Sequence, residues 1–252
     1  MNLAVCFKRV PDSAARIKVA ADGRSIDPQG VEFGISPYDE LALELALRLK
    51  EKAGAGEVVG YSVDPEGSDV AVRKALAIGI DKAVLIKGGS NFDGWTVAQA
   101  LAGALKGKSF DLILFGKSAI DDDGYQVPAM TAQLLGLPRA TSATSLEIEG
   151  GKAKLRRQAE GGEELLELAL PACVSVQKGI NGIHEKRFPS LKNIMAAKSK
   201  PVEQVAAAPS EPTLDLLKLE LPPERPAGRI VGQGAAAVPE LVRLLKEEAK
   251  VL

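Results

Sequence analysis

The sequence is poor in the residues from which most enzymes build their reacting groups. Among its 252 residues there are one histidine and two cysteines, and aromatic residues make up only 4%. His184 has no nucleophile beside it in the sequence, and Cys6 and Cys173 lie in separate apolar runs without metal-site spacing. These absences argue against nucleophilic catalysis, a disulfide framework and a zinc centre, and they predict two buried, reduced thiols.

A strong net charge, long apolar runs and a leader sequence are missing as well. The net charge of −1 gives no field that would attract nucleic acid or an acidic membrane. The longest apolar runs fall short of the ~20 residues that span a bilayer, and "NLAVCFKRV" at the N-terminus lacks the pattern of a signal peptide. We therefore expect a cytoplasmic protein that neither binds nucleic acid nor inserts into a membrane.

Segments of two kinds alternate through the first 140 residues. Runs rich in leucine or β-branched residues predict strands at 3–7, 57–63, 82–87 and 111–115. Between them lie stretches of helical period, several of which end at a glycine, as helices commonly do. Strands separated by helices pair in parallel with helices on both faces, so we expect a doubly wound, mostly parallel α/β sheet of the Rossmann-like kind.

The first helix is expected in "SPYDELALELALRLKEK", residues 36–52. Its apolar positions recur every three or four residues, which is the period of a helix. Ser36 with Asp39 three residues later resembles a capping box, and Pro37 stands at the favoured first helical position.

The pattern changes after about residue 140. Strand-like runs alternate with Gly-Gly turns over residues 145–179, which predicts antiparallel hairpins. A helix with Ser190 as its cap is expected in "RFPSLKNIMAAKSK". Residues 201–236 are rich in proline and alanine and predict an extended arm, followed by an amphipathic helix in "VPELVRLLKEEAKVL". Such an arm needs a surface to lie against, so we expect an obligate partner.

The segment "FGKSAIDDDGYQV", residues 115–127, runs from a predicted strand through a glycine-opened loop into a helix start. Ligands of doubly wound sheets bind at such strand ends, and the loops after strands 3–7 and 57–63 lie at the same edge. Its three consecutive aspartates leave three interpretations open. They form a solvated acidic turn, a magnesium site, or a loop whose carboxylates cap backbone N–H groups while other amides hold an anion.

No catalytic motif accompanies this loop. The sequence has no GxSxG elbow, no HExxH helix and no P-loop. After the first strand, "KRVPD" stands where dinucleotide-binding proteins carry their glycine fingerprint. The chain therefore lacks the residues of a self-sufficient enzyme.

Four stretches resemble the electron-transfer flavoprotein β subunit, in order and in spacing. "GKSAIDDDGYQV" resembles the family's adenine-nucleotide loop with its G-K-Q-A-I-D-D-D core, and "AVCFKRVPD" resembles its first strand and loop. "SPYDELALELALRLKE" is similar to the family's first helix, and "RFPSLKNIMAAKSK" to its R-[YF]-x-x-L-P-N-I-M-x-A-K segment. The likeness covers residues 1–205. The C-terminal arm resembles that of the family in its general character but not residue by residue.

The resemblance implies an electron carrier rather than an enzyme. The family is an αβ heterodimer with one FAD and, in its common type, a buried AMP in the β subunit. Its flavin takes electrons from dehydrogenases, such as the acyl-CoA dehydrogenases of fatty acid oxidation, and passes them to a membrane quinone oxidoreductase or another acceptor. The implied division is a nucleotide-binding domain with a partner-recognition loop over residues 1–200, and an arm and helix over 201–252 that pack on the α subunit.

The resemblance also implies the residues of the site. Gly116 to Val127 would wrap the AMP phosphate with backbone amides, and Tyr38 would face the flavin across the subunit interface. Leu191 would anchor the loop that enters a hydrophobic pocket on the dehydrogenase. The implied cofactor-binding residues are Cys6, Ser36, Pro37, Tyr38, Asp39, Val63, Gly116, Lys117, Ser118, Ala119, Ile120, Asp121, Asp122, Asp123, Gly124, Tyr125, Gln126 and Val127.

Departures from the family pattern leave two alternatives. Ser36, Tyr125 and Val127 stand where the family commonly has Asn, Asn and Thr, so side-chain donors to a phosphate are lost, and Lys192 replaces the usual proline. Val127 is shared with a bifurcating subgroup, which binds a second FAD in place of AMP and uses NADH, although the three aspartates and the bulky Tyr125 favour AMP. The other alternative is an adenine-nucleotide-hydrolysing or sensing protein of the same fold that holds magnesium.

Overall fold

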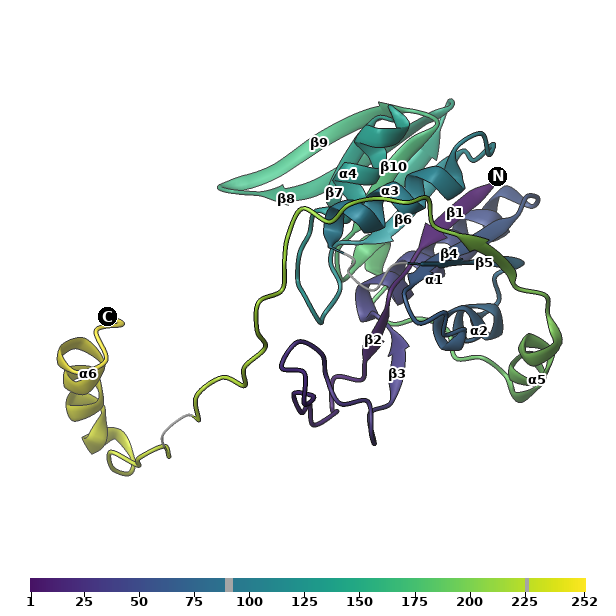
Figure 1. Cartoon of the computed structure of the whole chain (residues 1–252). Coiled ribbons are helices and arrows are strands. Elements are labelled where there is room, and N and C mark those ends of the chain that lie inside the picture. The colour runs from purple at the N-terminus through teal and green to yellow at the C-terminus, as the bar shows by residue number, and fades with distance from the viewer. Residues whose placement is uncertain (89–92, 225–226) are drawn as a thin grey trace.

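The computed structural model describes residues 1–88, 93–224 and 227–252, and it shows a large sheet with helices on both faces (Figure 1). The nine strands lie in the order β11-β5-β4-β1-β6-β10-β7-β8-β9. Their bounds are β1 (Leu3–Cys6), β4 (Val58–Asp64), β5 (Lys82–Lys87), β6 (Leu112–Gly116), β7 (Arg139–Glu149), β8 (Lys152–Ala159), β9 (Gly162–Ala169), β10 (Ala172–Val176) and β11 (Glu203–Ala206). A small antiparallel pair, β2 (Arg9–Pro11) and β3 (Phe33–Ile35), follows β1.

β1 lies between β4 and β6 and fixes their register. Leu3 pairs with Val58 of β4 on one side and with Leu112 of β6 on the other, and both pairings are parallel. All residues of β1 and β6 are buried, as is typical of parallel strands covered on both faces. The four predicted strands are confirmed, with their ends displaced by no more than one residue.

Helices cover both faces of the sheet. α1 and α2 share a core with Leu3 and Val5, whereas α3 and α4 share the opposite core with Ala4 and Cys6, because alternate strand residues point to opposite faces. This confirms the doubly wound, mostly parallel α/β fold. The helical bounds are α1 (Pro37–Ala53), α2 (Val70–Ile78), α3 (Gly94–Leu105), α4 (Val127–Leu135), α5 (Leu191–Ser199) and α6 (Val238–Glu247), with short 3-10 turns η1 (Ile180–Gly182) and η2 (Ala235–Ala237).

The predicted capping box at the start of α1 is wrong. Ser36 precedes the helix and Pro37 begins it, but the Ser36 side chain makes no capping hydrogen bond. Its hydroxyl instead donates to the Ser118 carbonyl oxygen at 3.4 Å, and the Asp39 carboxylate accepts N–H groups from two strand ends. Tertiary contacts therefore use the two side chains that the local pattern assigned to a cap.

The hairpin prediction is confirmed for β7, β8 and β9 but wrong for β10. The antiparallel hairpins turn at Gly150–Gly151 and at Gly161, where positive φ values of 57°, 76° and 78° favour glycine. β10 instead lies parallel to both neighbours, between β6 and β7. All five of its residues are buried, so it fits a doubly covered position rather than a half-exposed hairpin.

The predicted arm begins within the sheet. β11 pairs in parallel with β5 at the edge, so the sheet extends past residue 200, and the division of the chain at that point stays a prediction. Beyond β11 the chain leaves the sheet, and α6 lies apart from it (Figure 1). The arm prediction also spans residues 225 and 226, which lie outside the described residues. Within the described residues, no helix has the length and apolar character needed to cross a bilayer.

Candidate functional site

The order of the strands reverses between β1 and β6. After β1 the chain adds β4 and β5 on one side of the sheet, and it then returns through α3 to add β6 on the other side. Ligands of doubly wound sheets bind at this switch point, beyond the carboxyl ends of the strands. The loops that follow β1, β4 and β6 all leave the sheet at this edge.

Two consecutive basic residues after β1 tie these three loops together. Lys8 Nζ lies 2.9 Å from Asp121 Oδ1 and 2.8 Å from Asp122 Oδ2, in the loop after β6. Arg9 reaches the end of β4, where its Nε lies 2.5 Å from Asp64 Oδ2, and the loop after it, where a terminal nitrogen lies 2.5 Å from Glu66 Oε2. Neighbouring residues of an extended chain point to opposite sides, so one pair of side chains reaches two loops. The expected convergence of three strand ends is confirmed.

Asp39 joins the ends of β1 and β6 from the first turn of α1. Its Oδ2 accepts the backbone N–H of Lys8, and its Oδ1 accepts that of Gly116, both at 2.9 Å. Burial raises the pKa of Asp39 to about 7, against the two N–H donors, which lower it. A Cβ added at Gly116 would lie 2.5 Å from Asp39 Oδ1 and 2.6 Å from its backbone N, so glycine permits this close approach.

The three aspartates of the loop are held by the chain itself. Asp121 and Asp122 pair with Lys8, Asp122 Oδ1 also accepts the Gly124 N–H at 3.1 Å, and Asp123 Oδ1 accepts the Ser118 hydroxyl at 2.7 Å. In the part of the chain that the structure describes, no group of three or more possible ligands is arranged to hold a metal ion. Of the three aspartates, Asp122 accepts a backbone N–H as the capping interpretation expects, whereas the charges of Asp121 and Asp122 are paired with Lys8, a group that the sequence reasoning did not assign.

The loop backbone adopts a conformation that non-glycine residues rarely take. Asp123 and Tyr125 have φ values of 47° and 58°, in the left-handed region. Successive turns of this kind can aim backbone N–H groups at one point and form an anion-binding concavity. The loop then runs directly into α4 at Val127, where the helix dipole and the N–H groups of Val127 and Ala129 also favour an anion, whereas Pro128 between them has no N–H.

A lysine and two tyrosines meet beside this loop. Lys117 Nζ lies 4.7 Å from the centre of the Tyr38 ring and 5.3 Å from that of Tyr125, within range of a cation–π interaction. Tyr38 belongs to α1 and Tyr125 to the loop, so Lys117 connects the two. The cluster places a positive charge and two aromatic rings next to the possible anion site.

Of the remaining predicted residues, Ser36 contacts the loop directly, because its hydroxyl donates to the Ser118 carbonyl oxygen. Cys6 is buried at the end of β1, where burial raises the pKa of its thiol well above the usual range, and both cysteines are free, as predicted. Ser36 is buried and Pro37 is exposed, while Val63 near the end of β4 is half-buried. Lys8 and Arg9 were not among the predicted site residues, although two basic residues directly after a strand were a visible signal.

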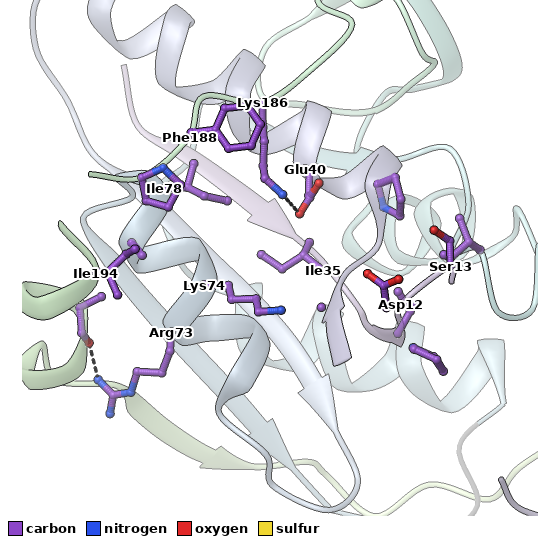
Figure 2. Close-up of a pocket in the computed structure, with 18 of the residues that line it drawn as sticks. Asp12, Ser13, Ile35, Glu40, Arg73, Lys74, Ile78, Lys186, Phe188 and Ile194 are labelled. Carbon is purple, nitrogen blue, oxygen red and sulfur yellow. Dashed lines mark hydrogen bonds and ion pairs between the residues drawn. The ribbon is translucent and has the colours of Figure 1, made fainter. Parts of the chain in front are cut away.

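Leu191 lies in a segment that exposes large apolar side chains, and the loop residue Ile120 lines a pocket together with residues of this segment. We call residues 187–200 the recognition segment; it contains α5, and Phe188, Leu191 and Met195 are 82%, 76% and 59% exposed. This pocket of about 580 Å³ lies beside the segment, and Phe188, Ile78 and Ile194 line the side opposite Ile35 (Figure 2).

A doubly wound parallel sheet, with its switch-point loops tied together, defines the Rossmann-like α/β class of proteins. Comparison with known proteins narrows this class. The family model described as "Electron transfer flavoprotein domain" matches residues 24–210, and the chain belongs to this family, among its β subunits.

Curated relatives match the chain along its whole length. "Electron transfer flavoprotein subunit beta" of Syntrophomonas wolfei subsp. wolfei is 40% identical over 100% of this chain and 98% of its own. The protein of the same name from Bacillus subtilis is also 40% identical, over 100% of both chains. The human protein of that name is 36% identical over 100% of this chain and 99% of its own. The family resemblance seen in the motifs is therefore confirmed.

Proposed function

We propose that the chain is the β subunit of a heterodimeric electron-transfer flavoprotein. It accepts electrons from dehydrogenases through a FAD shared with an α subunit, and it passes them to a quinone oxidoreductase or another acceptor. Its own loop 116–127 holds a structural AMP. The observation that carries the proposal is the loop itself, because Lys8 pairs with its carboxylates Asp121 and Asp122, and Asp123 and Tyr125 give its backbone positive φ values. The relatives' name, a flavoprotein subunit, supports the flavin and the second subunit.

The residues present fit the phosphate of AMP. Lys8 offsets the charge of Asp121 and Asp122, which would otherwise repel a phosphate. The start of α4 supplies N–H donors, and Lys117 supplies an ammonium group beside the loop. Because Tyr125 and Val127 replace two polar side chains of the family pattern, the backbone of this chain does most of the binding.

Tyr38 is the residue that we assign to the flavin. It is half-buried at the start of α1, with Lys117 against its ring. When bound, FAD supplies the redox chemistry, and Tyr38 shields and orients one side of it while the α subunit makes most of the contacts.

The C-terminal arm and α6 are assigned to the α subunit. Leu214, Leu217 and Ile230 in the arm are 67%, 79% and 87% exposed, and none of the ten described residues of α6 is buried. Large apolar side chains exposed along one segment mark a protein interface. The arm is fixed to the domain where Asp93 Oδ2 accepts the Thr213 N–H and hydroxyl at 2.6 Å, so it leaves from a defined point.

Leu191 is proposed as the anchor for the dehydrogenase. An anchor leucine that fills a pocket on the partner contributes ~2 kcal/mol or more, so Leu191→Ala should raise the KM for the donor about thirtyfold. Leu165 in β9 is 73% exposed and far from α5 in sequence, so Leu165→Ala is a matched control that should leave the KM unchanged. If Leu191→Ala transfers electrons with the wild-type KM, the leucine is not the anchor.

The proposal as a whole is tested by counting nucleotides. The chain is co-expressed with its α subunit, the complex is purified, and the released nucleotides are quantified by chromatography. One FAD and one AMP per heterodimer are expected. Two FAD and no AMP would show that a second FAD, as in the bifurcating subgroup, occupies the site proposed for AMP. A complex without flavin would refute the proposal.

A further inference from the structure

The recognition segment lies against α2 but buries few of its own side chains. α5 has nine residues, and Ala197 is its only buried residue. Isolated helices shorter than ~12–15 residues are marginal in water, and most helices in proteins depend on a packed apolar face. Ser190 caps the helix by accepting the Asn193 N–H at 3.2 Å, but one cap does not fix the position of the segment on the domain. Other contacts must do so.

Arg187 holds the first end of the segment. Its Nε lies 2.9 Å from Glu44 Oε2, its backbone N–H donates to the same oxygen at 3.0 Å, and one terminal nitrogen lies 2.5 Å from Glu51 Oε1. Glu44 is 2% exposed. Burial alone would raise the pKa of its carboxyl, but the hydrogen bonds from Arg187 and Arg48 hold that pKa below its usual range. The carboxylate is therefore charged, and Arg187 is bound by two acids at once.

The two acids belong to a row on one side of α1. Glu40, Glu44 and Glu51 are four and seven residues apart, spacings that return to the same face of a helix. Lys186, the residue before the segment, pairs with Glu40, so consecutive basic residues meet successive acids of the row (Figure 2). The contact is built into α1, which is also the helix that carries Tyr38 and Asp39.

Arg73 of α2 holds the other end of the segment. One terminal nitrogen of Arg73 donates to the carbonyl oxygens of Ala197 at 2.9 Å and of Lys200 at 2.6 Å. These carbonyls lie at the end of α5, where carbonyl oxygens lack helical partners and a positive charge favours the helix dipole. Asp69 holds the Arg73 Nε at 2.9 Å, so the guanidinium is itself oriented.

We propose that Arg187 and Arg73 are positioning residues that hold the recognition segment in the conformation that binds the dehydrogenase. The exposed side chains of Phe188, Leu191 and Met195 lie between the two arginine contacts. Ordering a flexible segment during binding costs free energy and lowers the affinity. A segment that is already ordered avoids this cost. The inference rests on the proposed function, because it assigns a role within the same docking surface.

The test removes one contact and separates binding from transfer. In the heterodimer with its flavin, Arg187→Ala should release the segment and raise the KM for an acyl-CoA dehydrogenase, reduced by its substrate, about tenfold because the competent fraction falls. The kcat at saturation should stay within about twofold of wild type. Backbone hydrogen exchange over residues 191–199 should become about tenfold faster, with the sheet unchanged. Arg73→Ala should act similarly from the other end.

Control variants distinguish positioning from loss of charge. Arg156 on β8 pairs with Glu163 at 3.8 Å, and Arg156→Ala should change neither exchange at 191–199 nor the KM. Arg187→Lys keeps the charge but not the fork of nitrogens and should restore part of the affinity. If the Arg187→Ala chain does not assemble with the α subunit, Glu51→Gln is the substitute variant. It weakens the ion pair between Arg187 and the exposed Glu51 and should raise the KM about threefold.

The outcomes separate the inference from the proposed function. If Leu191→Ala raises the KM and neither Arg187→Ala nor Arg73→Ala does, the segment docks the dehydrogenase but is not positioned by the arginines. Unchanged exchange over residues 191–199 would overturn the inference in the same way. If Leu191→Ala leaves the KM at the wild-type value, the docking surface itself, and with it the inference, fails.

Discussion

Lys8→Met tests whether the acidic loop is made fit for a phosphate by a single ammonium group. Lys8 Nζ is within 2.9 Å of oxygens of both Asp121 and Asp122. Methionine keeps the length of the side chain and removes its charge. The two carboxylates are then left in the loop without a counter-charge, and they would face the phosphate that the loop is proposed to hold.

The magnitude follows from how exposed the groups are. The side chains of Lys8 and Asp122 are 41% and 59% exposed, so each ion pair contributes only ~0.2–1 kcal/mol to stability. Losing both pairs should cost about 1 kcal/mol, which lowers the Tm of a chain of this size by about 2–4 °C. The effect on AMP is larger, because each unit-charge repulsion at ~4 Å amounts to ~1 kcal/mol in water. Two such repulsions, ~2 kcal/mol together, should weaken AMP binding roughly thirtyfold.

The assay compares AMP affinity and thermal unfolding in the purified heterodimer after its nucleotide is removed. Lys82→Met is the matched control, because Lys82 also pairs with an acid, Glu57, but lies at the opposite end of β5 from the site. The control should lose little stability and keep wild-type AMP affinity. A Lys8→Met complex that binds AMP as tightly as wild type would refute the reasoning that the lysine offsets the aspartates.

Two further predictions concern packing and pH. Gly116→Ala forces a Cβ against Asp39 and should cost about 1–3 kcal/mol, a fall in Tm of roughly 2–12 °C; Gly103→Ala, with open space around it in α3, should be neutral or stabilising in the same melts. Burial alone would raise the pKa of Asp93, but hydrogen bonds from Thr213 and from the start of α3 lower it. Its contribution to stability is therefore complete above its unfolded pKa of about 3.9 and lost as the pH falls below that value. Asp93→Asn should flatten this acid loss in urea titrations over pH 2–5, and an unaltered pH profile would contradict the assignment.

The local parts of the candidate site could be read from the sequence. The loop 116–127 was placed after a strand and before a helix, and the structure has β6 end at Gly116 and α4 begin at Val127. Capping of backbone N–H groups was among the alternatives for the three aspartates, and Asp122 accepts one such N–H, from Gly124. What could not be read is which group neutralises them, because Lys8 is more than a hundred residues away and pairs through the fold.

The sequence by itself determined the strands of the parallel core, the helices between them and the family. These depend on hydrophobic period and on contiguous motifs, which are properties of residues near one another in the chain. Only the tertiary structure decided that β10 lies parallel between β6 and β7, that β11 joins β5, and that Arg187 reaches α1. Each of these joins segments far apart in the chain, and period carries no information on which segments pair. The same reason explains Asp39, which its neighbours in sequence mark as a helix cap and which the folded chain uses to join two strand ends.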